Sequence, residues 1–248
     1  MKRRILVTGA GARIGQLLAI ALAKTGWHVV VHYNRSKSGA EQTLRDIKTA
    51  GGTGELLQAD LSDHRQTVQL IPELCNHSGP LHALINNASL FENDNLAQLQ
   101  AEQWDQQFAV NVKAPVFLAQ TFAAQLPKNE QGHVINLLDQ RLARLQPGFF
   151  SYTLSKAALQ TATTTMAQAL APQIQVNAVS PGPTLPNTRQ SAADFEQQQR
   201  TSLLQHGSPP DEIIAAVLFL LTASAITGQT LIVDGGQHLS WQTDGGKE

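Results

Sequence analysis

Short apolar runs alternate with longer amphipathic segments along nearly the whole chain. The short runs are rich in Val, Ile and Leu and span residues 5–8, 29–32, 55–58, 83–86, 134–138, 175–179 and 231–233. The amphipathic segments between them span residues 14–25, 39–50, 64–77, 101–125, 150–169 and 211–222. Because a continuous apolar run is typical of a strand covered on both faces, this order predicts a parallel sheet with right-handed helical crossovers. We therefore expect an α/β fold with helices on both faces of one sheet.

The composition bounds the remaining possibilities. No linker-like run divides the 248 residues, so we expect a single domain over residues 1–248. A net charge of -1 argues against a nucleic-acid surface and against a polybasic membrane contact. The first residues resemble a secretory signal, but Gly9, Gly11 and Arg13 interrupt the apolar stretch. The sequence contains no run of about 18 apolar residues, so we expect no membrane span. We therefore expect a cytoplasmic protein. It cannot form an intrachain disulfide, since Cys75 is its one cysteine, and we expect no metal, since no Cys/His spacing fits a metal site.

A glycine-rich turn at residues 8–15, Thr-Gly-Ala-Gly-Ala-Arg-Ile-Gly, joins the first strand to the first helix. Glycines in this place let the backbone approach a pyrophosphate, and the helix N-terminus supplies N–H donors to the anion. Arg13 stands where such loops often carry glycine, and its guanidinium could pair with a phosphate or with a ligand carbonyl. The predicted contacts of this loop are Gly9, Gly11, Arg13, Ile14 and Gly15.

The turn after the second strand indicates which nicotinamide nucleotide binds. A protein that prefers NAD usually places an acid there, against the ribose 2′-hydroxyl. This chain has no carboxylate in residues 32–39, whereas Arg35 and Ser36 could hold a 2′-phosphate. We therefore predict NADPH, with Tyr33 and Asn34 beside it. After the third strand, Asp60 and Leu61 are placed for the adenine edge, although Asp60 could equally cap the helix that follows.

Tyr152 and Lys156 lie four residues apart, on one face of a predicted helix. A cation beside a phenol lowers the pKa of the phenol, which makes it usable as a proton donor and acceptor at neutral pH. Asp139 precedes Tyr152 by thirteen residues. An ionised carboxylate only accepts hydrogen bonds and would repel the charge that develops on a ketone oxygen. Asp139 therefore favours a substrate that presents N–H groups or takes up a proton on nitrogen, unless it is a helix cap or a surface acid.

With these features the chain resembles the short-chain dehydrogenase/reductase family over nearly its whole length. The matching motifs, in the family's order, are the loop at 8–15, Asp60, Asn86-Asn87-Ala88, Asn111, Tyr152-x-x-x-Lys156, Pro181-Gly182 and Asp234-Gly235-Gly236. The resemblance implies a single Rossmann-type, doubly wound domain with a seven-stranded parallel sheet in the order 3-2-1-4-5-6-7. It also implies a homotetramer, with helices around residues 104–125 and 150–169 at one interface.

Within that family the chain is most similar to the pteridine reductases, and bacterial dihydromonapterin reductases share much of the pattern. The shared features are Arg13, the His-Tyr-x-Arg-Ser turn at 32–36, Asn-Ala-Ser-x-Phe at 87–91, and Asp139 in place of serine. The resemblance implies NADPH-dependent reduction of a dihydropterin such as dihydromonapterin or dihydrobiopterin, or of dihydrofolate, to the tetrahydro form. A pterin also fits the charge argument, because it presents N–H donors and its C=N bonds take up a proton on nitrogen.

The resemblance also implies roles for individual residues. Tyr152 would protonate the ring nitrogen with Asp139 relaying or holding the proton, and Lys156 would tune Tyr152 and bind the nicotinamide ribose. Asn111 would bend its helix and hold a water of the proton relay, or it is simply a buried, satisfied asparagine. Phe91 would stack on the pterin opposite the nicotinamide, or it is a core residue. The remaining contacts are Ser89 and Arg13 with the pterin's polar edge, and Asn87, Ala88, Ser89, Lys156, Pro181, Gly182 and Thr184 with the cofactor.

Two segments carry no pattern that aligns. Residues 184–208 are polar and follow the sixth strand, so they would form a substrate lid or an ordinary surface insertion. The tail at 237–248, with Trp241, could reach a neighbouring subunit's site or be disordered.

Two other functions remain open from the sequence. One is an NADPH-dependent carbonyl reductase, for example of 3-oxoacyl thioesters, in which serine has been replaced by Asp139. The other is a regulator that binds NADPH without turnover, although such proteins can lose the tyrosine or lysine that this chain keeps.

Overall fold

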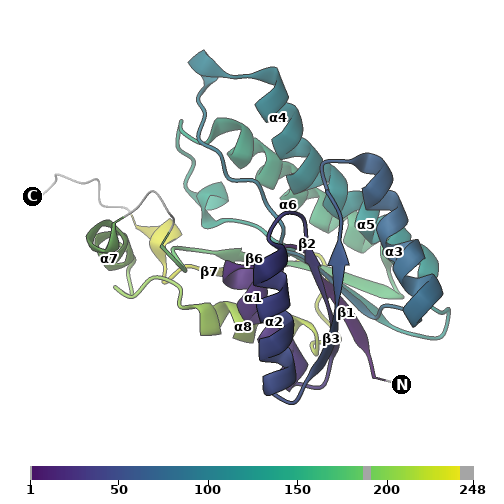
Figure 1. Ribbon diagram of the computed structural model, residues 1–248. Coiled ribbons are helices and arrows are strands. Elements are labelled where there is room, and N and C mark those ends of the chain that lie inside the picture. The colour runs from purple at the N-terminus through teal and green to yellow at the C-terminus, as the bar shows by residue number, and fades with distance from the viewer. Residues whose placement is uncertain (1, 187–190, 241–248) are drawn as a thin grey trace, which may run out of the picture.

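Seven parallel strands form one sheet in the order β3-β2-β1-β4-β5-β6-β7 (Figure 1). The computed structural model describes residues 2–186 and 191–240. The strands are β1 Arg4–Val7, β2 His28–Tyr33, β3 Thr53–Gln58, β4 Ala83–Asn86, β5 Gly132–Leu137, β6 Ile174–Pro181 and β7 Thr230–Val233. This order confirms the predicted Rossmann-type topology, and all seven apolar runs form strands.

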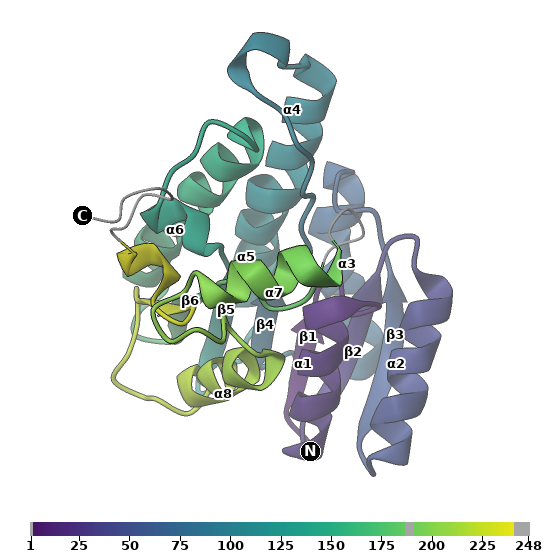
Figure 2. The same cartoon turned by 90° about the vertical axis from the view of Figure 1, so that its left-hand side faces the viewer.

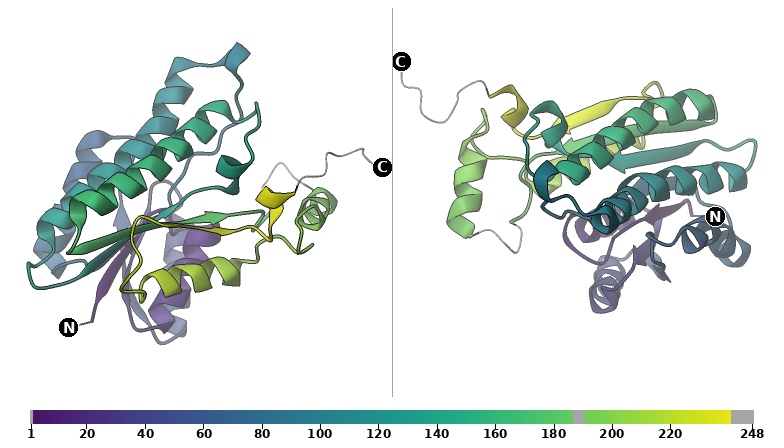
Figure 3. Two further views of the ribbon diagram at one scale, coloured as in Figure 1. Left: turned by 180° about the vertical axis from the view of Figure 1, so that it is seen from behind. Right: turned by 90° about the horizontal axis from the view of Figure 1, so that it is seen from above.

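Helices cover both faces of the sheet (Figure 3). The helices are α1 Arg13–Lys24, α2 Lys37–Thr49, α3 His64–Ser78, α4 Ala101–Phe108, α5 Ala114–Gln125, α6 Phe150–Leu170, α7 Ala192–Arg200 and α8 Pro210–Leu220. Short 3₁₀ turns lie at η1 Leu96–Gln98, η3 Gln140–Ala143 and η4 Gln237–Leu239. One core cluster joins α1 and α8 to the sheet, and a second joins α3 and α5 to the opposite face.

The central strands alternate between these two clusters. Ile5 and Val7 of β1 belong to the cluster under α1 and α8, whereas Leu6 belongs to the cluster under α3 and α5. Successive side chains of a strand point to opposite faces, so a strand buried on both sides needs an apolar residue at every position. The continuous apolar runs of the sequence follow from this requirement.

The predicted helix at 101–125 is three elements in the structure. Between α4 and α5, the segment η2 Ala109–Lys113 forms a π-helical turn. Pro115 lies in the first turn of α5 and has no backbone N–H, so it cannot bond to the carbonyl of Asn111 as an α-helix requires. The wider turn is a typical response to such a missing bond, and π-turns occur often at functional sites.

The polar segment at 184–208 contains a helix that the sequence pattern did not predict. Helix α7 begins with a capping box in which Ser191 and Asp194 bond reciprocally. In Figure 2 the amino terminus lies at the bottom, and α7 crosses above the labelled strands, on the side where the parallel strands end. Residues 187–190 of the predicted lid, and residues 241–248 of the predicted tail with Trp241, lie outside the described residues.

Two features are absent from the described residues. None of the helices found there is both long enough and apolar enough to cross a membrane. Across 2–186 and 191–240, no three His, Cys, Asp or Glu side chains are grouped so that they could hold a metal ion.

Candidate active site

A cavity of about 630 Å³ opens where the parallel strands end, from the start of α1 to the start of α6. It lies at the point where the strand order reverses, between β1 and β4, which is the usual ligand crevice of open α/β sheets. Every predicted site residue lines this cavity except Gly11, Tyr33, Arg35, Ser36 and Asn111. The sequence therefore identified most of the wall.

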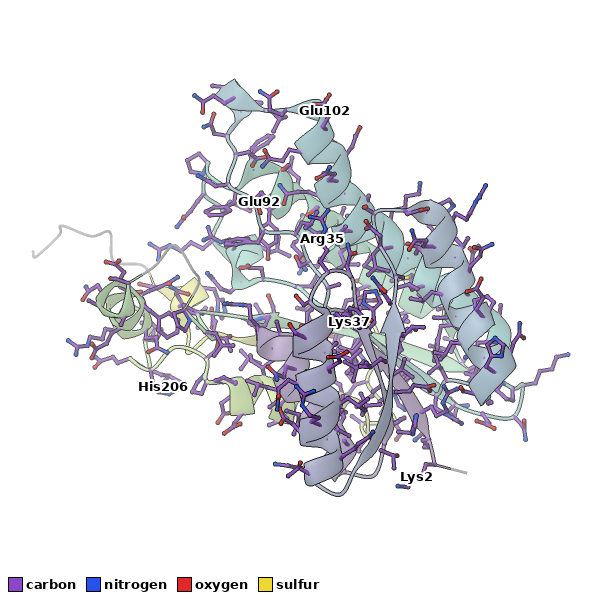
Figure 4. All side chains as sticks on the ribbon, viewed as in Figure 1. Lys2, Arg35, Lys37, Glu92, Glu102 and His206 are labelled. Atoms are coloured by element: carbon purple, nitrogen blue, oxygen red, sulfur yellow. The ribbon has the colours of Figure 1, made fainter. Side chains whose placement is uncertain are left out.

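The predicted cofactor contacts that do not line the cavity lie in different surroundings. The Tyr33 ring is buried in the core cluster under α1, and Gly11 packs against the start of α2, where an added Cβ would lie 3.0 Å from the Ser36 carbonyl. Arg35 and Ser36 are exposed on the turn between β2 and α2. Arg35 is labelled in Figure 4. The charge of Arg35 nevertheless contributes to lowering the pKa of Asp60, a cavity residue, so the guanidinium lies close to the cavity's edge.

The glycine loop is held tightly against its neighbours. Gly9 has a left-handed backbone with φ 65°, and a Cβ on Gly15 would lie 2.4 Å from the Gly9 carbonyl oxygen. Neither position therefore accepts a larger residue without a shift. Helix α1 begins immediately after this loop with no side-chain cap on its N-terminal N–H groups, and its first turn lines the cavity. An uncapped helix N-terminus facing a cavity fits an anionic phosphate.

His32 supports this loop from below, a role that the sequence reasoning did not assign to it. Its Nδ1 accepts a hydrogen bond from the Gly9 N–H at 3.1 Å, and its Nε2 lies 3.2 Å from the Ala59 carbonyl oxygen. These partners require the neutral ring with the proton on Nε2. Burial lowers the pKa of His32 to about 4, which agrees with a neutral imidazole.

Arg13 extends from the loop across the cavity to the segment after β6. Its backbone has φ 52°, in the region that favours glycine, which explains why glycine is common at this place in related loops. The guanidinium donates to the carbonyl oxygens of Pro186 at 2.8 Å and Leu185 at 3.2 Å. The acceptors of Arg13 in this structure are therefore two backbone carbonyls of the predicted lid.

Asp60 does not cap the helix that follows it. The N-cap of α3 is Asp63, whose side chain accepts from the N–H groups of Arg65 and Gln66. Asp60 instead accepts from the backbone N–H and the hydroxyl of Ser62, at 2.9 and 2.7 Å. These bonds fix its carboxylate on the cavity wall, so the capping alternative is wrong.

Asp139 and Tyr152 meet at the other end of the cavity. The Tyr152 hydroxyl donates to Asp139 Oδ2 at 2.8 Å, and Asp139 Oδ1 accepts from the Arg141 N–H at 2.8 Å. Asp139 is therefore both the cap of the turn η3 and the partner of the phenol, because its two oxygens serve different donors. The carboxylate points at the tyrosine and lines the cavity instead of extending into bulk solvent.

The phenol is held in its protonated form. Burial raises the pKa of Tyr152 well above its usual value, the charge and hydrogen bond of Asp139 raise it further, and Arg141 opposes the rise. The Lys156 Nζ donates to the Leu137 carbonyl at 2.7 Å and lies 5.8 Å from the centre of the Tyr152 ring. The expectation of a lowered pKa for Tyr152 is wrong for this structure, because burial and the neighbouring carboxylate dominate and raise it.

Lys156 is itself strongly affected by its surroundings. Burial lowers the pKa of Lys156 to about 8, although the charge of Asp139 opposes this change. At neutral pH its ammonium group is mostly charged, with one N–H bond directed at Leu137 and the cavity beside it. It therefore keeps donors that a ligand hydroxyl could accept.

Asn111 lies behind the wall instead of on it. Its Oδ1 accepts from the Leu90 N–H at 2.9 Å and from the Ser89 hydroxyl at 3.1 Å. Its Nδ2 donates to the Leu90 carbonyl and to the Ser155 hydroxyl, both at 3.0 Å. The fully buried amide thus joins the loop after β4 to helix α6. Its side chain is satisfied within the protein, and its role in a proton relay stays a prediction.

Phe91 is part of a stacked group that the sequence reasoning did not foresee. Its ring lies parallel to that of Phe149, with centroids 4.3 Å apart, and meets Tyr152 edge-on at 4.7 Å. The Arg141 guanidinium lies over both phenylalanine rings, 4.7 Å from Phe149 and 5.6 Å from Phe91. Phe91 and Arg141 line the cavity whereas Phe149 does not, so Phe149 supports the wall from outside. The sequence held only weak signs of these contacts. Arg141 lies two residues after Asp139, and Phe149 directly precedes α6.

Comparison with known proteins agrees with this geometry. The family model described as enoyl-(acyl carrier protein) reductase matches residues 9–238. The chain is 32% identical to a 3-oxoacyl-[acyl-carrier-protein] reductase, FabG, of Staphylococcus aureus, over 96% of this chain and 99% of the relative. It is 30% identical to a short-chain type dehydrogenase/reductase of Picea abies, over 95% of this chain and 92% of the relative.

Among solved structures, the chain is similar to the FolM alternative dihydrofolate reductase 1 of Brucella canis, which was crystallised with NADP. The two share 44% sequence identity and superpose with a TM-score of 0.93, covering 98% of this chain and 96% of that one. Fold, cavity, motif order and relatives lead to one assignment. The chain belongs to the short-chain dehydrogenase/reductase family.

Proposed function

We propose that the protein reduces dihydropterins, including dihydrofolate, to the tetrahydro form with NADPH as the hydride donor. The observation that carries this proposal is the hydrogen bond from the Tyr152 hydroxyl to Asp139 Oδ2 inside the cavity. The similarity to a dihydrofolate reductase crystallised with NADP supports both the substrate class and the cofactor.

The residues present fit the dinucleotide. The uncapped start of α1 faces the cavity and would take the pyrophosphate, and Asp60 lines the end where an adenine would lie. Arg35 is exposed at that same end, and its guanidinium would hold a 2′-phosphate. Lys156, whose ammonium keeps donors beside the cavity, would bind the nicotinamide ribose. The bound cofactor would supply the hydride from C4 of its nicotinamide.

Tyr152 is the proposed proton donor. Reduction of a C=N bond places negative charge on nitrogen, and a neutral phenol within reach of that atom neutralises it. Asp139 and burial keep the proton on Tyr152 until then, because both raise its pKa. The same carboxylate accepts hydrogen bonds from substrate N–H groups, and it would oppose the alkoxide of a ketone reduction.

Replacement of Asp139 by serine tests the proposal. In D139S we expect kcat/KM for dihydrobiopterin to fall by about a hundredfold or more, an effect of the size seen when one charged or donor group of a reaction site is lost. Reduction of acetoacetyl-CoA should stay the same or rise, since serine supplies a neutral donor. D139N is the matched variant: it keeps an oxygen for the Arg141 N–H but removes the charge and the second acceptor oxygen, so it should lose dihydrobiopterin activity as D139S does.

The similarity to 3-oxoacyl-[acyl-carrier-protein] reductases makes a carbonyl reductase the second candidate. This candidate is favoured if the wild-type protein oxidises NADPH with acetoacetyl-CoA but with no dihydropterin. Full dihydrobiopterin activity in a folded D139S variant would also contradict our proposal. A thermal melt of each variant shows whether a loss of activity reflects unfolding.

A further inference from the structure

Arg141 is a cationic cavity residue whose side chain has no part in the reaction described above. The cavity wall contains three cationic groups, Arg13, Lys156 and Arg141. Arg13 donates to the carbonyls of residues 185 and 186, and Lys156 donates to Leu137. Within 2–186 and 191–240, the Arg141 guanidinium contacts two ring faces and no hydrogen-bond acceptor. Its five N–H groups therefore remain available to a ligand.

The position of Arg141 separates it from the predicted phosphate contacts. Arg141 follows β5, whereas Asp60 follows β3, and β2, β1 and β4 lie between these two strands. The start of α1, which would take the pyrophosphate, follows β1. A ligand anion at Arg141 would therefore belong to the substrate end of the cavity, where Phe91 and Tyr152 lie.

The guanidinium is also held in place before any ligand arrives. Its backbone N–H is bonded to Asp139 Oδ1, and its side chain lies over the rings of Phe149 and Phe91. Stacking occupies the face of a guanidinium and leaves its edge, with the N–H groups, free for a planar acceptor. A side chain that is already ordered loses less conformational entropy on binding.

We propose that Arg141 selects substrates that carry a carboxylate on the pterin side chain, as the glutamyl tail of dihydrofolate does, over pterins with short uncharged side chains. This inference rests on the proposed function and names the substrate class within it. A carboxylate is the planar anion that a guanidinium binds with two parallel hydrogen bonds.

Steady-state kinetics with matched substrates test this proposal. In R141Q, the ratio of kcat/KM for dihydrofolate to that for dihydrobiopterin should fall about tenfold or more, the loss expected for a charge-assisted hydrogen bond. Most of the change should lie in KM for dihydrofolate. The glutamyl dimethyl ester of dihydrofolate, which has the same shape without the charges, should lose far less in R141Q. R141K, which keeps the charge but not the fork, should recover part of the ratio.

R144Q is the control, since Arg144 is a half-buried cation three residues away that does not line the cavity. R144Q should leave the ratio unchanged. If the ratio falls equally in R144Q, the preference comes from the overall positive charge of this region and not from a contact with Arg141, and the assignment is overturned. The assignment is also overturned if kcat/KM in R141Q falls equally for all three substrates, or falls for none of them. Either result leaves the proposed function intact, because the wild-type protein still reduces dihydropterins. If the wild-type protein reduces no dihydropterin, the proposed function fails and the tail assignment fails with it.

Discussion

At the scale of single residues, the two oxygens of Asp139 explain why an acid works where a serine is expected. Oδ1 holds the turn η3 through the Arg141 N–H, and Oδ2 takes the hydrogen bond of Tyr152. A serine has one side-chain oxygen and could not do both with the same geometry. The carboxylate thus fixes its own rotamer and keeps the phenol protonated.

The pKa of Lys156 leads to a prediction for the alkaline limb of activity. Since that pKa is about 8, kcat/KM should decline above pH 8 as the ammonium group loses its charge. The K156R variant stays protonated, so its profile should be flat over this range, at a lower level because the longer side chain fits less well. Initial rates of NADPH oxidation from pH 6 to pH 10, written as kcat/KM, measure the effect.

Unfolding would not cause this decline of kcat/KM above pH 8. A buried lysine with a lowered pKa is neutral above pH 8 in the folded protein while the unfolded chain still holds the proton, up to its usual pKa of 10.5. The unfolded state therefore binds more protons in this window, and the contribution of Lys156 to stability rises with pH. A wild-type profile that stays level to pH 10 would show that the charge on Lys156 is not needed.

At the scale of secondary-structure elements, the π-helical turn η2 connects the site to the helical layer. It places the Asn111 amide against the backbone of Leu90 and the hydroxyl of Ser155, so the loop carrying Phe91 is bonded to both η2 and α6. An α-helical turn would direct the same side chain elsewhere, because one residue fewer separates its hydrogen-bonded partners.

Replacing Asn111 by leucine should therefore destabilise the protein. The substitution leaves the N–H and carbonyl of Leu90 without partners, and each such buried group costs about 1–3 kcal/mol. We expect the free energy of unfolding to fall by about 2–6 kcal/mol, with a drop in Tm of roughly 2–4 °C for each kcal/mol. The measurement is a thermal melt beside Q106L, an exposed position of α4. Equal melting temperatures for N111L and the wild type would show that this contact is not structural.

Helix α7 shows what periodicity overlooks at this scale. Its nine residues include no buried side chain, so the segment has no apolar stripe to read. The helix is instead stabilised by the Ser191–Asp194 capping box, and its Phe195 side chain lines the cavity. A capping box is visible in a sequence, whereas the contact with a cavity is not.

At the scale of the whole molecule, buried or half-buried histidines lie at both ends of the sheet. His32 lies at the end of β2 near the glycine loop, while His82 and His133 lie at the starts of β4 and β5. Burial lowers the pKa of His32 and of His133 to about 4, and lowers that of His82 as well. The rings of His32 and His133 are therefore neutral in the folded protein at neutral pH.

These pKa values predict that the protein loses stability in mild acid. The unfolded chain takes up protons on these rings below about pH 6.5, but the folded protein does so only near pH 4. The contribution of the neutral rings is therefore complete above pH 6.5 and disappears as the pH falls towards 4. For His32, which is fully buried, this difference is worth about 3 kcal/mol.

Urea unfolding between pH 4.5 and pH 7 measures this dependence. H32Q keeps an acceptor for the Gly9 N–H and a donor for the Ala59 carbonyl without a titrating group, so its curve of unfolding free energy against pH should be flatter. H77Q, at an exposed position of α3, should keep the wild-type slope. Parallel curves for H32Q and the wild type would rule out His32 as a source of the acid sensitivity.

The strand order and the joint role of Tyr152 and Asp139 were implied by the resemblance to a known family, whereas the sequence pattern by itself determined the seven strands, their parallel direction and the glycine loop. These features are local patterns, or they follow from rules that connect one strand to the next, and therefore need no knowledge of distant contacts. The tertiary structure alone decided that the pKa of Tyr152 is raised, that Phe149 stacks on Phe91, and that Arg141 lines the cavity. Each of these depends on burial or on distances between chain segments that meet only after folding, and neither quantity is encoded in the spacing of residues along the chain.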